Sequence, residues 1–159
     1  MKLSSILQPE RTVRTAEASS KKKAIELAAN TIVRIEPGLE VGDVYRSLID
    51  RERLGTTAIG HGVALPHCRL ASCTEITGAL FVLDEPVDFA AYDDEPVDII
   101  FVLLVPQTET NEHLKTLAML AERFEDENYR KALRTTRTDA DLFQTATADQ
   151  GLASRPQPQ

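Results

Sequence analysis

The sequence predicts a single α/β domain with a mixed central sheet of about five strands flanked by helices. Three observations predict this fold class: segments with helical apolar spacing are mixed with short runs rich in β-branched residues, turn-forming residues separate the segments, and no internal repeat is visible. The chain has 159 residues, the size of one typical domain. Hydrophobic residues make up 42% of it and charged residues 27%, both close to globular averages, so we expect one buried core.

Two helices are expected in the first third of the chain. The first carries an apolar stripe that follows the candidate cap Ser20 and ends at Pro37 and Gly38. The second is expected from Val41 to about Arg53, with a glycine just past its end. This helix therefore ends in a basic turn beside the loop that follows it.

Three apolar runs predict strands. Val63 and Leu65 alternate like a half-buried strand, and Pro66 then removes the next ladder donor, so we expect the following side chain at an edge or rim of the sheet. Residues 76–83 form a second strand-like run. Residues 99–105 form the strongest one, which is too short for most helices and rich in β-branched residues. This last run is predicted to be the central strand.

The last third of the chain predicts three helices. The first is amphipathic, is capped by Asn111 and extends to about Phe124, and its apolar side carries Leu114, Leu117, Ala118 and Ala121. Two shorter helical patterns follow, at residues 129–133 and 139–146. The chain is thus divided into a domain and a short C-terminal remainder.

Composition and charge exclude several classes of protein. The domain is expected over residues 1–148, and residues 149–159 lack the apolar content to pack, so we expect a mobile tail there. The formal charge of −7 argues against binding to nucleic acid. No apolar run reaches the roughly 18 to 20 residues that span a membrane. Residues 1–7 are too short and mixed for a signal peptide, so we expect a cytoplasmic protein.

The most informative segment runs from Arg51 to His67. Three glycines break the helical pattern and allow tight turns, and a proline directly precedes the histidine. An imidazole is partly uncharged near neutral pH, so it can act as a nucleophile, a proton carrier or a metal ligand. We therefore expect this segment to expose the imidazole of His67 for a chemical role.

This segment resembles the signature of the enzyme IIA domains of the fructose/mannitol type in the bacterial phosphoenolpyruvate-dependent phosphotransferase system. In that family an arginine-glutamate pair leads through glycine and threonine to a Pro-His phosphoryl acceptor. Residues 95–106 look like the family's buried central strand, and residues 112–120 resemble the helix that carries its second active-site histidine. The resemblance covers about residues 1–148 and is greatest to the nitrogen branch of the family.

The resemblance implies roles for five residues. His67 would be phosphorylated by phospho-HPr or by the nitrogen-branch homologue of HPr, and Arg51 matches the active-site arginine, whose planar donors suit phosphate oxygens. His113 matches the second histidine, which orients the phosphoryl group. Thr56 and Thr57 would add hydroxyl donors to the phosphate. No metal or cofactor is implied, because the phosphoryl group already sits on an activated phosphoramidate.

The family offers two outcomes for the phosphoryl group. In sugar uptake, a IIB partner takes it and works with a membrane-bound IIC. In the nitrogen branch, phosphorylation changes binding to regulatory protein targets, and the absence of fused IIB or IIC segments favours this role. A third alternative is a pure interaction domain that has lost phosphorylation.

Other readings of the same residues remain open. Arg51 could serve only to complement the dipole of its helix, and His113 could cap or pack the next one. Cys68 stands where the family usually has glycine, so it could crowd the acceptor, alter the backbone angles or form a redox-sensitive thiol. Four nearby residues are also possible zinc ligands, His61, His67, Cys68 and Cys73, although their spacing matches no zinc finger or ribbon. The two cysteines could alternatively form a disulfide.

Overall fold

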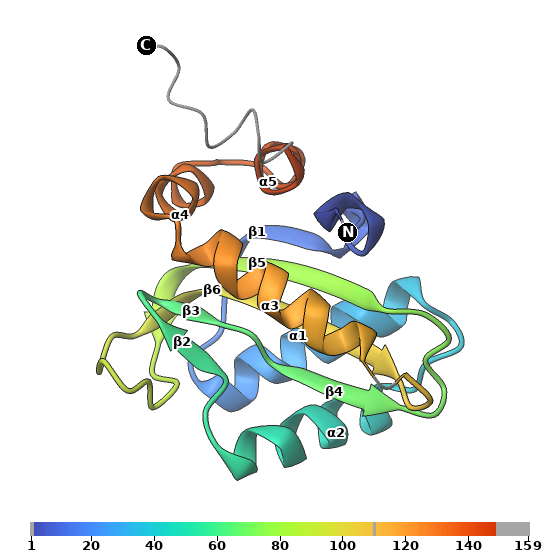
Figure 1. Ribbon diagram of the computed structural model, residues 1–159. Helices are drawn as coiled ribbons and strands as arrows, with labels where there is room; N and C mark the ends of the chain where they lie inside the picture. Colours follow the sequence, from blue (N-terminus) through green and yellow to red (C-terminus); the bar gives the residue numbers. More distant parts are fainter. Residues whose placement is uncertain (1, 110, 149–159) are drawn as a thin grey trace.

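The computed structural model describes residues 2–109 and 111–148; the expected tail at residues 149–159 lies outside this part. The described residues form five α-helices, six strands and two short 3-10 helices (Figure 1). Their bounds, in chain order, are η1 Leu3–Ser5, η2 Pro9–Arg11, β1 Thr12–Ala16, α1 Lys21–Ile35, α2 Val41–Leu54, β2 Ala58–Gly60, β3 Val63–Ala64, β4 His67–Leu70, β5 Thr77–Val87, β6 Val97–Pro106, α3 Glu112–Glu125, α4 Glu127–Arg134 and α5 Asp139–Thr147. Within the described residues, no helix is both long and apolar enough to cross a membrane.

The strands form one mixed sheet in the order β1-β5-β6-β3-β2, and β4 also pairs with β6. Strand β6 is antiparallel to β5 on one side and parallel to both β3 and β4 on the other. Helices α1 and α2 lie on one side of the sheet, and α3 crosses the other side (Figure 1). The predicted α/β class is confirmed, with six strands in place of about five.

Side chains of β6 alternate between the two faces of the sheet, as a strand requires. Ile100, Val102 and Leu104 enter the core under α1 and α2, while Phe101 and Leu103 enter the core under α3. All five are almost completely buried. Full burial of such a side chain is worth about 1.5–3 kcal/mol, so this one strand stabilises both layers.

The two N-terminal helices begin and end where the sequence predicts. The Ser20 hydroxyl accepts a hydrogen bond from the Lys23 amide at 3.1 Å, which caps α1. Helix α2 starts at Val41, and Gly55 is its C-terminal cap. Arg51 therefore lies in the last turn of α2, and its side chain reaches the Gly55 carbonyl at the start of the segment that leads to the Pro-His pair.

Strands β1, β2 and β4 were not individually predicted, because each is short and pairs with residues distant in the sequence. Strand β4 begins immediately after Pro66. The proline lacks an N–H donor but keeps its carbonyl oxygen, which accepts a hydrogen bond from the Leu103 amide at 2.9 Å. The ladder to β6 therefore resumes after Pro66, and the next side chain lies in a strand at the rim of the sheet.

Helix α3 buries only part of the face expected for it: Leu117 and Ala121 pack against the core, as the spacing predicts. Leu114 is 58% exposed and Ala118 is also exposed, whereas Arg123 is buried and donates to the Ala146 carbonyl at 3.3 Å. A hydrogen-bonded arginine thus occupies part of the inner face of the helix. The spacing of apolar residues in the sequence cannot reveal such a buried polar side chain. Asn111 does precede the helix, but its side chain makes no capping hydrogen bond.

The turn between β2 and β3 depends on glycine. Gly62 has φ of +79°, and a β-carbon there would lie 2.6 Å from Nη2 of Arg134. That guanidinium cannot easily move, because it donates to the Asp98 carboxylate and, at 2.7 Å, to the His61 carbonyl. The turn and helix α4 are therefore locked together at this position.

We expect Gly62→Ala to lower the free energy of unfolding by about 1–3 kcal/mol, because it combines a left-handed backbone with this close contact. Urea unfolding checks this. Gly38→Ala is the matched control, since a β-carbon there meets nothing within 4 Å. Equal midpoints for the two variants would contradict the assigned role of Gly62.

Candidate active site

Helices α2 and α3 and strand β4 enclose a cleft of about 530 Å³ at the β4 edge of the sheet. Three residues named from the sequence line it together: Arg51 from α2, His67 from β4 and His113 from α3. Arg69, Leu54 and Asp50 also line it, and the Asp50 carboxylate pairs with Arg53 at 3.5 Å. The fold therefore gathers two imidazoles and two guanidinium groups from segments up to 62 residues apart in one hollow.

His67 is the first residue of β4 and is half-buried. Its Nδ1 lies 2.8 Å from the carbonyl oxygen of Leu65. A carbonyl oxygen carries no proton, so Nδ1 must be the donor in this hydrogen bond. In the neutral ring, Nε2 is then the nitrogen with the free lone pair. The geometry fixes which ring atom is available as a nucleophile.

The pKa of His67 is lowered from its ordinary value, first because burial disfavours the charged ring. The hydrogen bond to the Leu65 carbonyl acts in the opposite direction, while the nearby charges of Arg51 and His113 lower the pKa further. The ring consequently stays neutral to a lower pH than a free imidazole. Its lone pair is available throughout the physiological range.

Arg51 lies in the last turn of α2 and lines the cleft. Its Nη1 donates to the Gly55 carbonyl at 2.9 Å, so the helix-end role considered from the sequence is present. Within the described part of the chain, its other guanidinium N–H groups have no protein acceptor. One arm is thus anchored and the rest of the planar fork remains free to bind an anion.

Arg69 is a site residue that the sequence reasoning missed. Its Nη2 lies 3.3 Å and 3.4 Å from the two ring nitrogens of His113. Because alternate residues of a strand share a face, the side chain two positions after His67 points to the same side of the sheet. This simple spacing would have identified Arg69, had a strand been expected after Pro66.

Thr56 and Thr57 do not line the cleft. The Thr56 hydroxyl donates to the Phe89 carbonyl at 2.6 Å, and the Thr57 hydroxyl donates to a carboxylate oxygen of Glu52 at 2.7 Å. Both hydroxyls hold the loop between α2 and β2 in place. Their proposed contact with phosphate stays a prediction.

Glu52 places a buried carboxylate behind the site, a role that the sequence did not reveal. One oxygen accepts the Thr57 amide at 2.9 Å, and the same oxygen pairs with Nζ of Lys21 at 3.1 Å. Lys21 also lies 5.2 Å from the centre of the Phe89 ring. The carboxylate therefore joins the start of α1, the end of α2 and the loop that leads toward His67.

Cys68 lines the cleft beside His67, but only 8% of the residue is exposed. Its side chain enters the core beneath α2, and its backbone is that of an ordinary strand, without the positive φ that favours glycine. Burial raises the pKa of its thiol to about 12, so the thiol stays protonated. The structure therefore disagrees with unusual backbone angles and with a reactive thiolate at this position.

The zinc alternative has no geometric support. His61 lies in a separate hollow, where its amide donates to Asp93 at 2.9 Å. Cys68 and Cys73 are both buried free thiols. Among the described residues, no three histidine, cysteine or acidic side chains are grouped as a metal site would require.

Comparison with known proteins identifies the class. Residues 5–148 match the family model described as "Phosphoenolpyruvate-dependent sugar phosphotransferase system, EIIA 2", and the chain belongs to this family. The match confirms the family predicted from the segment that ends at His67.

Particular relatives agree with the nitrogen branch. The chain is 40% identical over 144 residues to the nitrogen regulatory protein of Pseudomonas aeruginosa, covering 91% of this chain and 94% of that protein. The crystal structure of nitrogen regulatory protein IIA-Ntr from Neisseria meningitidis has a TM-score of 0.84 and 40% identity, covering 90% of this chain and 97% of that one. Mannitol enzyme IIA of Escherichia coli, solved in complex with phosphorylated enzyme IIB, shares the fold at a TM-score of 0.74 and 19% identity, covering 91% and 100% of the two chains.

We expect Cys68→Gly to lower the free energy of unfolding by about 1–3 kcal/mol, because it removes a buried side chain and adds backbone freedom in a strand. Cys68→Ala serves as the control and should retain most of the stability. Chemical unfolding of the three proteins measures the difference. A glycine variant more stable than wild type would show that Cys68 is strained, contrary to its position here.

Proposed function

We propose that this chain is a cytoplasmic phosphoryl-accepting regulatory protein of the nitrogen branch, and that Nε2 of His67 receives the phosphoryl group from an HPr-type carrier. The observation that carries the proposal is the cleft in which the Leu65 carbonyl holds Nδ1 and leaves the Nε2 lone pair free among three other basic side chains. Family membership supports the same chemistry.

The transfer is a displacement at phosphorus. The Nε2 lone pair of His67 forms the new N–P bond, and the N–P bond to the donor's histidine breaks, so the donor nitrogen recovers its electron pair. The Nδ1 proton stays on the ring and continues to donate to Leu65. The positive charge that the phosphorylated ring acquires is therefore stabilised by a carbonyl already in place, and no proton has to be moved to a base.

Two guanidinium groups and the His113 ring surround His67 and can stabilise the charge on the migrating phosphoryl oxygens. Arg51 offers the free part of its guanidinium fork, and Arg69 and His113 approach from β4 and α3. These donors are held by secondary structure before the phosphoryl group arrives. Such preorganisation is the usual source of rate enhancement in phosphoryl transfer.

Exposed apolar side chains beside the cleft support a protein donor. Leu54 is 83% exposed and lines the cleft, and Leu114, next to His113 in α3, is 58% exposed. Apolar residues at the centre of a polar rim are typical of protein interfaces. The mannitol enzyme IIA that shares this fold has been solved with a phosphorylated protein partner.

Phosphorylation supplies the regulatory signal by changing the charge of this surface. A phosphoryl group adds negative charge among Arg51, Arg69 and His113, so a target that contacts these side chains binds the two states with different affinity. Relatives named nitrogen regulatory protein support this role over sugar uptake. A IIB protein that removes the phosphoryl group at the donor's rate would instead support the sugar relay.

We expect phosphoenolpyruvate, enzyme I and a matching HPr-type carrier to place one acid-labile phosphoryl group on wild type and none on His67→Ala. Intact mass before and after incubation measures the group. His61→Ala is the control, because His61 lies outside the cleft and should leave labelling unchanged. Undiminished labelling of His67→Ala would contradict the assignment of His67 as the phosphoryl acceptor.

Arg51→Lys keeps the positive charge but loses the planar fork, so we expect phosphoryl transfer to slow by about tenfold or more. Arg53→Lys is the matched control on the same helix, since Arg53 is exposed and does not line the cleft. Single-turnover transfer rates are compared with thermal unfolding of each variant. Unchanged rate and stability would leave Arg51 with a helix-end role alone.

A further inference from the structure

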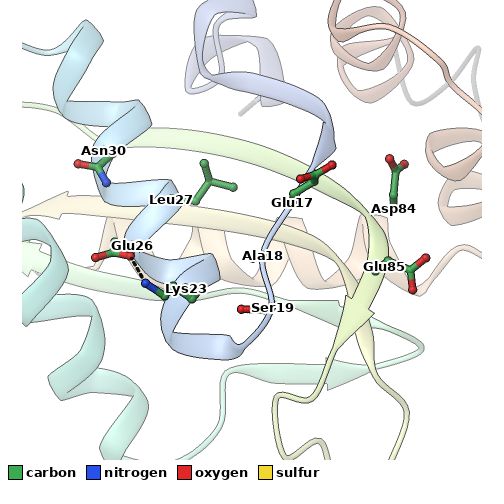
Figure 2. Close-up of a pocket in the computed structure, with 9 residues that line it drawn as sticks. All are labelled: Glu17, Ala18, Ser19, Lys23, Glu26, Leu27, Asn30, Asp84 and Glu85. Carbon is green, nitrogen blue, oxygen red and sulfur yellow. Dashed lines mark hydrogen bonds and ion pairs between the residues drawn. The ribbon is translucent and has the colours of Figure 1, made fainter.

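A second hollow lies at the other edge of the sheet from His67. It has a volume of about 680 Å³, and its walls come from the residues after β1, from α1 and from β5 (Figure 2). Strand β1 is separated from β4 by β5 and β6, which places the two strands about 14 Å apart at normal strand spacing. None of the residues that line this hollow lines the His67 cleft. The two surfaces can be occupied at the same time.

Four carboxylates surround the hollow, which we call the β1 groove: Glu17, Glu26, Asp84 and Glu85. Lys23 is the one basic residue in its described lining. It pairs with Glu26 at 3.4 Å, and both side chains are more than half exposed. The groove therefore carries a net negative charge and attracts cations.

The carboxylates of the β1 groove are only weakly neutralised. Asp84 lies 3.4 Å from Nη1 of Arg14, and the side chain of Asp84 is 52% exposed. Within the described residues, the carboxylates of Glu17 and Glu85 have no ion pair or hydrogen-bond donor. An exposed pair at such distances contributes little, so most of the negative charge is available to a partner.

The floor of the β1 groove is apolar. Ala18 and Leu27 are partly buried and pack against the core under α1, while the acidic side chains stand around them (Figure 2). Lysine and arginine match this arrangement, because their aliphatic stems cover apolar surface while their charged ends reach the rim. An apolar side chain between two basic ones would occupy the floor itself.

We propose that the β1 groove binds a basic segment of a protein partner, in which lysine or arginine residues flank an apolar side chain. The argument is the charge complementarity of an acidic rim and the apolar floor inside it. The proposal does not depend on phosphorylation of His67. It gives the chain a second, independent contact, through which one partner can be held while another uses the cleft.

The test uses the full chain and a fluorescent peptide, acetyl-Lys-Arg-Leu-Lys-Arg-amide, in an anisotropy titration at low and moderate salt. We expect Glu17→Gln combined with Glu85→Gln to weaken binding by about tenfold. The matched control is Glu122→Gln combined with Glu125→Gln, which removes the same charge from exposed positions on α3, across the sheet. The control should stay within about twofold of wild type, because only general attraction is lost.

Further measurements distinguish the proposed basic peptide segment from other ligands of the β1 groove. Replacing the peptide's leucine with serine should weaken binding to wild type, and amide shifts on titration should cluster at Ala18, Leu27 and Glu85. No binding to wild type, or equal weakening in both double variants, would overturn the proposal. Displacement of the peptide by an equal concentration of spermine would also overturn it, in favour of a small cation. His67→Ala should bind the peptide like wild type, so this test and the phosphorylation test fail separately.

Discussion

Strand β6 is the constraint on which the rest of the fold depends. Its backbone pairs with β5, β3 and β4, and its alternating side chains enter the cores on both faces of the sheet. A slip of one residue would exchange the two sets of side chains, so burial fixes the register. The pairing of His67 with Leu103 then decides that His67 faces α3 and Cys68 faces α2.

Elements with local signals could be predicted from the sequence, and elements with remote partners could not. Ser20 caps α1 within its own turn, and residues 99–105 are apolar throughout, so both were identified. Strand β1 is stabilised by parallel pairing with β5, in which Thr12 lies opposite Leu80, a residue 68 positions away. No pattern within five residues encodes such a partner, because pairing is a property of the assembled sheet.

The site was predictable to the extent that one segment and one helix resemble those of a known family. Arg51, His67 and His113 were named in this way, and they lie in one cleft. Arg69 was missed because its strand was missed. The phosphate contact of Thr57 stays a prediction, and in the structure its hydroxyl donates to Glu52, because a buried carboxylate competes for nearby donors. Which of two partners a hydroxyl takes depends on burial, which a sequence does not state.

The Glu52 carboxylate has a consequence for the lifetime of complexes. By holding Lys21 and Thr57, it keeps three segments behind His67 ordered in the free protein. A surface that is already ordered loses less conformational entropy on association, a saving of about 0.5–1.5 kcal/mol for each side chain that need not be immobilised. A small contact area then suffices for recognition. Under the proposed function, such complexes should dissociate quickly, because the chain would meet a donor and a target in turn.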